Sequence, residues 1–123
     1  MIRVERIYDN PKGSNNDGFR ILVDRLWPRG LRKDRVNIDM RQKDIAPSTS
    51  LRKWFSHDDE KWNEFKCRYF KELDNNNSSS NSVNAILDKI KNERSITLLY
   101  DAKDEKFNNA IALKEYLEKK IKE

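Results

Sequence analysis

A chain of 123 residues is about the length of one domain, so we expect a single domain over residues 1–123 with one hydrophobic core. Charged residues make up 38% of the chain and no apolar run approaches the ~18 residues of a membrane span, which excludes an integral membrane protein, while twelve aromatic residues exclude wholesale disorder. The single cysteine, Cys67, excludes an internal disulfide, and the lack of a signal-peptide pattern after Met1 favours a reducing, cytoplasmic location.

Residue alternation and turn chemistry predict two strands in the first third of the chain. Alternating apolar residues predict a strand over 2–8, and Asn-Pro, Gly-Ser and Asp-Gly pairs predict a loop over 9–18. The continuous apolar run at 21–23 predicts a buried central strand within 19–27. Residues 31–47 have no clear period, so we expect them to be mostly irregular.

Apolar residues three and four positions apart predict helices in the rest of the chain. The predicted helices cover residues 48–55, about 59–73, 83 to about 90 and 108–122, with Ser48 or Ser50 capping the first, Ser82 the third and Asn108 the last. The polar run at 74–82 predicts a flexible connector without a function. Residues 95–100 predict the clearest strand in the chain.

Strands separated by helices predict an α/β domain, a small three-layer-like fold whose short, mostly parallel sheet is flanked by helices. In such folds ligands gather outside the carboxyl ends of the strands. This rule places residues 24–30 and 100–104 on the same rim of the sheet, where a site is expected.

Positive charge is concentrated beside the second predicted strand. Residues 19–35 contribute +4 of the net charge of +5, an excess typical of an anion site and not of a uniformly basic coat. Arg25 and Arg29 are the first candidates, because a guanidinium presents a planar fork of donors that suits carboxylate or phosphate. Asp24 orients or neutralises that fork, and Trp27 offers a ring for stacking. The alternatives are a salt bridge that closes the sheet edge and a tryptophan of the core.

His57 is the only histidine, so any acid–base catalysis by imidazole must use it. The alternative is a helix-junction residue whose acidic neighbours cap the next helix. Cys67 falls among aromatic residues of a predicted helix, and we expect it to be buried and inert. One histidine and one distant cysteine give no metal-ligand spacing, so no metal site is expected. No P-loop, dinucleotide fingerprint or other standard cofactor motif occurs, so no cofactor is expected.

A second group of candidates follows the strand at 95–100. Asp101, Lys103 and Asp104 take the position where α/β proteins often place reactive groups. Asn108 opens the last helix, whose free N–H groups can bind an anion, and the alternative there is ordinary N-capping.

Several strings of the sequence resemble one known family. The most specific is Leu-Val-Asp-Arg-Leu-Trp-Pro-Arg-Gly at 22–30, which Asp-Gly-Phe-Arg at 17–20 precedes. The other matching strings are Ala46-Pro47-Ser48, Leu51-Arg52-Lys53-Trp54-Phe55, His57-Asp58, Trp62-Asn63-Glu64-Phe65, Arg68-Tyr69 and Leu98-Leu99-Tyr100. On these residues, which run nearly end to end, the chain resembles the YeaO-like branch of domain-of-unknown-function family 488. The resemblance names a family and not a reaction.

The resemblance implies a typical set of residues, whose polar and basic members are site candidates. The implied ligand-binding residues are Asp24, Arg25, Trp27, Arg29, Arg68 and Tyr69, with His57 as the single candidate catalytic residue.

The loop after the last strand departs from the family. Asp101 stands where the family has a small residue, Lys103 where it has arginine and Asn109 where it has histidine. If that histidine is an essential acid or base, Asn109 cannot replace it, so the departures argue against catalysis through this loop. Anion binding through Arg25 and Arg29 is unaffected.

Three functional hypotheses follow. In the first, Arg25 and Arg29 clamp a phosphate-bearing or carboxylate-bearing small molecule, with or without catalysis. In the second, the basic segment and Trp27 bind nucleic acid, although a net charge of +5 is low and no recognised nucleic-acid motif is present. In the third, the arginines lock the fold of a structural or partner-binding domain. A concave pocket lined by both arginines favours the first, an open basic face the second, and buried ion pairs the third; the sequence sets no oligomeric state.

Overall fold

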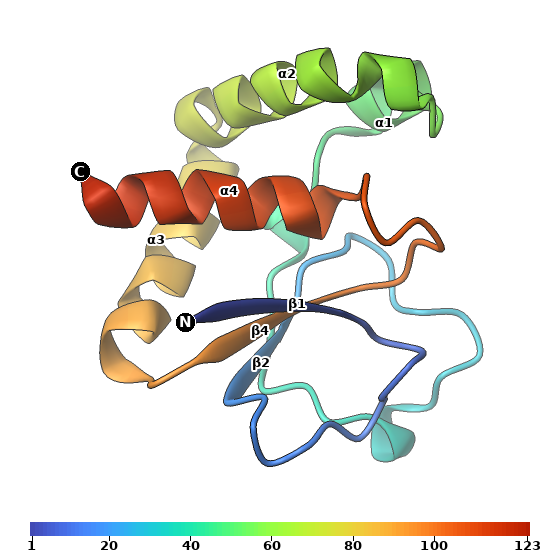
Figure 1. Ribbon diagram of the computed structural model, residues 1–123, viewed down its shortest axis with the longest axis vertical. Helices are drawn as coiled ribbons and strands as arrows, with labels where there is room; N and C mark the ends of the chain where they lie inside the picture. The colour runs from blue at the N-terminus through green and yellow to red at the C-terminus, as the bar shows by residue number, and fades with distance from the viewer.

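The computed structural model describes all residues 1–123 and confirms a small α/β domain (Figure 1). The strands are β1 (Ile2–Arg6), β2 (Phe19–Leu22), β3 (Met40–Arg41) and β4 (Ile96–Tyr100). The α-helices are α1 (Thr49–Phe55), α2 (Trp62–Asn75), α3 (Asn77–Asn92) and α4 (Asn109–Lys122). Three single helical turns are η1 (Lys33–Arg35), η2 (Lys43–Ile45) and η3 (Asp59–Lys61).

The four strands form one parallel sheet in the order β1-β4-β2-β3. β4 lies in the centre, with Ile96 opposite Ile2 of β1 and opposite Phe19 of β2. The pairing continues one residue past β2, where the Val23 amide donates to the Leu99 carbonyl at 3.1 Å. Because parallel strands end at the same edge, the residues that follow β2 and β4 are brought together, as the sequence predicts.

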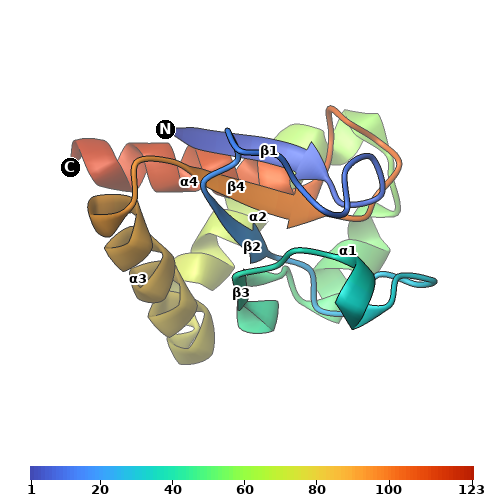
Figure 2. The same ribbon diagram turned by 90° about the horizontal axis from the view of Figure 1, so that it is seen from below.

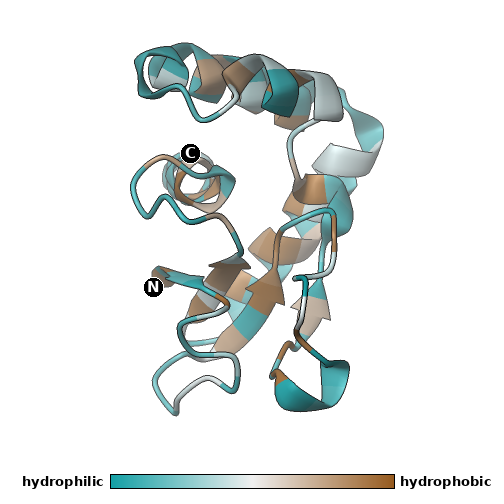
Figure 3. Ribbon diagram, turned by 90° about the vertical axis from the view of Figure 1, so that its right-hand side faces the viewer, coloured by the Kyte–Doolittle hydropathy of each residue, from teal (hydrophilic) through white to brown (hydrophobic).

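The main core lies between the sheet and the helices. Residues two apart on a strand point to the same face, so Ile21 and Val23 of the β2 segment join Ile96 and Leu98 of β4 in one apolar cluster. α4 packs against β1 and β4, and α2 lies beyond it (Figures 1 and 3). The predicted helical spacing supplies the other side of this cluster, including Phe65, Tyr69 and Leu73 of α2 and Leu113 and Leu117 of α4.

The opposite face of the sheet is covered by loops instead of helices (Figure 2). Ile7, Leu22 and Leu99 form a smaller buried cluster there. Tyr8, Trp27, Leu31 and Ile38 from the two long loops pack against it. The flanking by helices that the sequence predicts is therefore found on one face only, because the segments before α1 hold no amphipathic helix.

Side-chain caps fix the start of three helices. Ser48 caps α1 by accepting from the Leu51 amide at 3.2 Å, and Asn108 caps α4 by accepting from the Ile111 amide at 2.9 Å, as predicted. The third cap differs, because Asn76 and not Ser82 caps α3, by accepting from the Ser79 amide in its first turn at 3.1 Å. The Asn-rich run therefore starts a helix.

The largest difference from the sequence prediction lies at residues 74–82. All of them except Asn76 are helical, since α2 ends at Asn75 and α3 begins at Asn77. The hydroxyls of the serine run bond to the backbone of neighbouring segments: Ser79 donates to the Asp44 carbonyl at 3.1 Å and Ser80 to the Leu73 carbonyl at 2.8 Å. The serines are part of the packing between η2, α2 and α3, which composition alone does not reveal.

Cys67 is exposed, which corrects the prediction of a buried thiol. The buried face of α2 carries Phe65, Tyr69 and Leu73 at intervals of four, and Cys67 lies two positions away from the first two, on the other side of the helix. None of the helices is long and apolar enough to cross a membrane.

Candidate functional site

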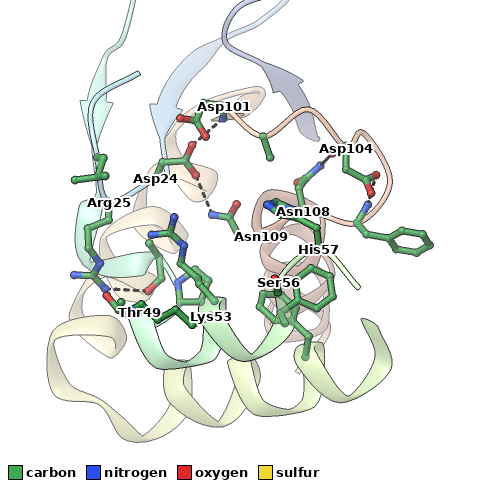
Figure 4. Close-up of a pocket in the computed structure, with 18 of the residues that line it drawn as sticks. Asp24, Arg25, Thr49, Lys53, Ser56, His57, Asp101, Asp104, Asn108 and Asn109 are labelled. Atoms are coloured by element: carbon green, nitrogen blue, oxygen red, sulfur yellow. Dashed lines mark hydrogen bonds between the residues drawn. The ribbon is translucent and has the colours of Figure 1, made fainter. Parts of the chain in front are cut away.

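A cavity of about 860 Å³ opens between the carboxyl ends of β2 and β4 and the helix α1 (Figure 4). Three segments far apart in the chain supply most of its lining: residues 24–26 after β2, residues 46–57 in and around α1, and residues 101–109 from the end of β4 to the start of α4. Phe65 of α2 completes it. The cavity lies on the rim where the strand order places ligands in open α/β sheets.

Arg25 reaches the cavity from the end of β2. Its Nη2 is 3.5 Å from the Ala46 carbonyl, its only hydrogen bond, and its buried Nε has no partner. No carboxylate lies within ion-pair distance of the guanidinium, whereas the backbone carbonyl of Arg25 accepts from Arg41 Nη2 at 2.9 Å. The backbone of Arg25 is therefore held while most of its donor capacity is unused.

The helix α1 brings two further cations to the same cavity. Arg52 and Lys53 lie in its last turn, where positive charge is favoured by the helix dipole, and both side chains are exposed without an ion pair. Ser56 and His57 then turn the chain away with φ of 45° and 57°. Left-handed backbone at non-glycine residues is strained, and such strain is concentrated at functional sites.

Asp24 lies on the opposite side of the cavity, at the end of β2. Its Oδ2 accepts from the Asp101 amide at 2.8 Å and its Oδ1 from Asn109 Nδ2 at 3.1 Å (Figure 4). Burial, next the negative charge of Asp101, and also a hydrogen bond shared with the Asp101 side chain raise the pKa of Asp24 to about 7, while the hydrogen bonds from Asn109 and the Asp101 amide oppose that rise. A carboxyl group that is half protonated near neutral pH is unusual and marks a candidate functional residue.

The loop between β4 and α4 is held in place by backbone contacts. Arg6 Nε donates to the carbonyls of Asp101 at 3.2 Å and Ala102 at 2.9 Å. Asp104 accepts from the Phe107 and Lys106 amides, and these bonds, followed by the charge of His57, lower its pKa. The loop is thus fixed from both ends, with the carboxylate of Asp101 beside that of Asp24 and without an ion pair.

The charges around the cavity do not neutralise one another. Its lining includes four cations, Arg25, Arg52, Lys53 and Lys103, and three carboxylates, Asp24, Asp101 and Asp104. None of these seven side chains forms an ion pair within 4.0 Å. Opposite charges that face one cavity without meeting can interact with a ligand placed between them.

The structure brings together seven of the residues that the sequence singles out. Those that line the cavity are Asp24, Arg25, His57, Asp101, Lys103, Asp104 and Asn108. Arg29 does not: its side chain is exposed and its carbonyl accepts from the Tyr8 hydroxyl at 2.7 Å. Trp27 is also outside, because its ring packs on the loop side of the sheet and its Nε1 donates to the Leu31 carbonyl at 2.6 Å.

The two candidates on α2 lie elsewhere. Tyr69 is fully buried in the core and its hydroxyl donates to the Ile45 carbonyl at 2.5 Å. Arg68 is exposed, pairs with Glu64 one turn earlier and lies over the Trp54 ring with its guanidinium carbon 4.2 Å from the centroid. Neither residue lines the cavity, so Arg25 is the only predicted binding arginine that does.

The three departures from the family pattern in the loop after β4 and at the start of α4, namely Asp101, Lys103 and Asn109, all line the cavity. Arg52 and Lys53 were given no role at the sequence level, because the direction in which α1 points depends on its packing against α2. No three His, Cys, Asp or Glu side chains are close enough to hold a metal ion.

Comparison with known proteins identifies relatives over the whole chain. Residues 1–123 match the sequence model of a family described as DUF488-N3i, the inactive DUF488-N3 subclade. The uncharacterized protein YeaO of Escherichia coli is 39% identical over 116 residues, which cover 94% of this chain and 96% of YeaO. The uncharacterized protein Rv3073c of Mycobacterium tuberculosis is 46% identical over 72 residues, 58% of this chain and 59% of that protein, and Mb3100c of Mycobacterium bovis gives the same figures.

No solved structure matches the chain. The family match covers every residue and the similarity to YeaO nearly the full length of both proteins. The chain therefore belongs to the DUF488-N3i family, the YeaO-like branch that its central arginine string resembles.

Proposed function

We propose that this protein binds a small anionic molecule in the cavity between α1 and the ends of β2 and β4, without transforming it. One observation carries the proposal: Arg25, Arg52, Lys53 and Lys103 line a single cavity and none of them is paired with a carboxylate.

Arg25 is the central contact in this proposal. Its backbone is held by Arg41 and its guanidinium is partly buried, so little side-chain freedom is lost on binding. A planar guanidinium with free N–H groups can form two parallel hydrogen bonds to a phosphate or a carboxylate. Arg52 and Lys53, which are more exposed, add attraction that salt screens more strongly.

Two observations support binding without catalysis. The family to which the chain belongs is described as an inactive subclade. His57, the single candidate for acid–base catalysis by imidazole, lies at the cavity but forms no hydrogen bond that would orient its ring. A contact between His57 and a bound anion is compatible with this arrangement.

Isothermal titration calorimetry at low ionic strength tests the proposal with inorganic phosphate, sugar phosphates, nucleotides and carboxylates. Arg25→Gln is expected to weaken binding of any responding anion by about 10- to 100-fold, since a hydrogen bond to a charged group contributes about 1.5–3 kcal/mol. Arg35→Gln is the matched control, because Arg35 lies in the same basic segment, is exposed and does not line the cavity. Equal affinities of the two variants, or no response to any anion, would contradict the proposal.

Nucleic-acid binding is the second candidate, because Arg29, Arg32, Lys33 and Arg35 are all exposed outside the cavity. Such an open group of basic side chains would contact phosphates in a way that weakens steeply with salt. In that case Arg29→Gln and Arg35→Gln would lower affinity for an oligonucleotide while Arg25→Gln would not. The same three variants therefore separate the two candidates.

A further inference from the structure

The cavity has an acidic side and a basic side, which face each other across the space between the strand ends and α1 (Figure 4). The acidic side consists of Asp24 and Asp101, and the basic side of Arg25, Arg52 and Lys53. Lys103, on the loop that follows Asp101, is a further cation of the lining. We propose that the ligand is a zwitterion, whose anionic group contacts the basic side and whose protonated amine lies between Asp24 and Asp101. This inference rests on the proposed function and specifies the class of molecule bound.

Asp101 is the first observation that supports an amine. Its backbone is fixed, since its amide donates to Asp24 and its carbonyl accepts from Arg6. Its carboxylate forms no ion pair, and its side chain shares a hydrogen bond with the Asp24 carboxyl, which helps to raise the pKa of Asp24. The two carboxyl groups therefore share a proton where a cation could lie, and a donor that carries positive charge can replace that proton.

The negative charge of Asp104, the third carboxylate of the cavity, is compensated by its neighbours. Asp104 accepts two backbone amides and is close enough to His57 for that charge to lower its pKa. The pKa of Asp24 is instead raised, because this carboxyl group is buried beside Asp101. The uncompensated negative charge is therefore confined to the acidic side.

An ammonium group suits the acidic side better than a neutral hydroxyl group does. Both can donate hydrogen bonds to Asp24 and Asp101, but only the ammonium group removes the repulsion between the two carboxylates. Arg25, Arg52 and Lys53 do not remove this repulsion, because none of them forms an ion pair with Asp24 or Asp101 across the cavity.

If an amine binds at this place, its affinity should depend on pH. The groups that act on Asp24 are Asp101 after β4 and the Asn109 amide on α4, and Asp24 in turn helps to raise the pKa of the buried Tyr69 hydroxyl on α2. The other charged groups around the cavity are Arg25, Arg52, Lys53, His57, Lys103 and Asp104. Because Asp24 is partly protonated at neutral pH, an ammonium group must displace its proton, so affinity for an amine rises between pH 6 and pH 8. An anion without an amine lacks this requirement.

Matched pairs of small molecules test the inference by calorimetry on the full chain. O-Phosphoethanolamine is compared with ethyl phosphate, and 6-aminohexanoate with hexanoate, so that only the amine differs within a pair. We expect the amine to raise affinity by about tenfold or more in at least one pair, the gain of a charge-assisted hydrogen bond. The gain should be larger at pH 8 than at pH 6, and binding should release protons to the buffer.

Asp101→Asn is the main variant, because an asparagine amide can donate to Asp24 in place of the shared proton, which removes the charge of residue 101 and keeps its contact in the fold. It is expected to reduce the gain from the amine to threefold or less while ethyl phosphate binds as before or more tightly. Asp34→Asn, an exposed aspartate outside the cavity, is the control and should keep the full gain.

The outcomes distinguish this inference from the proposed function. If ethyl phosphate and hexanoate bind in a manner that depends on Arg25 but the amine adds nothing, the zwitterion inference is wrong and the anion site stands. If the amine raises the affinity of Asp101→Asn as much as that of the wild-type protein, the amine does not lie between Asp24 and Asp101. If no probe binds at all, the proposed function fails, and the inference fails with it.

Discussion

Arg20 and Arg25, five positions apart in the chain, occupy opposite kinds of environment. Arg20 is 1% exposed and its guanidinium donates to the carbonyls of Pro11 at 3.0 Å and Asn10 at 2.8 Å. It also pairs with Asp17 at 3.4 Å through Nε, without hydrogen-bond geometry, and with Glu5 at 3.7 Å. Arg25 has one long hydrogen bond and no ion pair. We refer to Arg20, Asp17, Glu5 and the two carbonyls as the Arg20 cluster.

The carboxylates of the two regions differ in the same way. Burial alone would raise the pKa of Asp17, but hydrogen bonds from Ser14 and the charges of Arg20 and Arg3 lower it. Burial also raises the pKa of Asp24, and there the charge of Asp101 adds to the rise. Glu5, the other carboxylate of the Arg20 cluster, has its pKa raised by burial and by Asp17, and the charge of Arg20 opposes that rise. Each carboxylate of the Arg20 cluster thus has a cation within 4.0 Å, whereas no carboxylate of the cavity does. Paired charges stabilise a fold, and unpaired charges that line a cavity are free to interact with a ligand.

The largest effect is expected for Arg20→Met. The substitution leaves Glu5 without a cation, Asp17 with Arg3 alone, and two loop carbonyls without a donor. Breaking a buried ion pair from one side typically costs about 3–5 kcal/mol, so the variant should be strongly destabilised or unfolded at 37 °C. Urea unfolding followed by circular dichroism measures the loss, and one below about 1 kcal/mol would show that the Arg20 cluster is not closed as described.

Asp24→Asn is expected to stabilise the protein at neutral and alkaline pH. The folded-state pKa of Asp24, about 7, is above the unfolded value, so the wild-type protein loses stability from this group as the pH rises from about 4 to 7. The loss has a maximum slope of about 1.4 kcal/mol per pH unit and ends above pH 7. The variant lacks it but cannot accept both hydrogen bonds that Asp24 accepts, which offsets about 1–2 kcal/mol.

Urea unfolding of both proteins at pH 5, 6, 7 and 8 measures this difference. The free energy of unfolding of Asp24→Asn relative to wild type should increase up to pH 7 and then level off. A difference that is independent of pH would mean that Asp24 is ionised throughout and that the cavity is compensated like the Arg20 cluster.

The position of the cavity could largely be predicted from the sequence, because it depends on where the strands end. The apolar run at 21–23 and the strand at 95–100 are short-range patterns, and parallel pairing then brings Asp24 beside Asp101. The string at 24–30 suggested Arg25 and Arg29 as partners in a clamp. In the structure only Arg25 lines the cavity, since the chain turns away after Leu26 and Arg29 is directed to solvent.

Other features could not be predicted from the sequence, because they depend on how elements distant in the chain pack together. The contribution of Arg52 and Lys53 follows from the position of α1, which α2 fixes. The helical state of residues 77–82 follows from the cap by Asn76 and from hydrogen bonds to η2 and α2. The polar composition of this run does not predict these contacts. Tyr69 and Arg68 were implied by family membership, which does not separate residues that keep the fold from residues that bind.

Gly13→Ala tests how tightly the Arg20 cluster is packed. Gly13 has φ of 77°, and a β-carbon there would collide with the Arg20 guanidinium. Gly30→Ala is the matched control, with φ of 83° and nothing within 4 Å of an added β-carbon. The control should cost about 1–2 kcal/mol from backbone strain alone, and Gly13→Ala about 1–3 kcal/mol more from displacement of Arg20. Equal losses in thermal unfolding would mean that Arg20 moves freely.

The smallest effect on stability is expected for Arg25→Met, the counterpart of Arg20→Met. The substitution removes one 3.5 Å hydrogen bond to Ala46 and leaves no carboxylate unpaired, while the bond from Arg41 to the backbone of residue 25 persists. It also removes a positive charge from a cavity that contains Arg52, Lys53 and Lys103, which reduces repulsion. We therefore expect a free energy of unfolding within about 0.5 kcal/mol of wild type, or slightly above it, as is common when a binding residue is replaced. A loss comparable to that of Arg20→Met would show that Arg25 supports the fold, and it would move this arginine from the binding site to the structural framework.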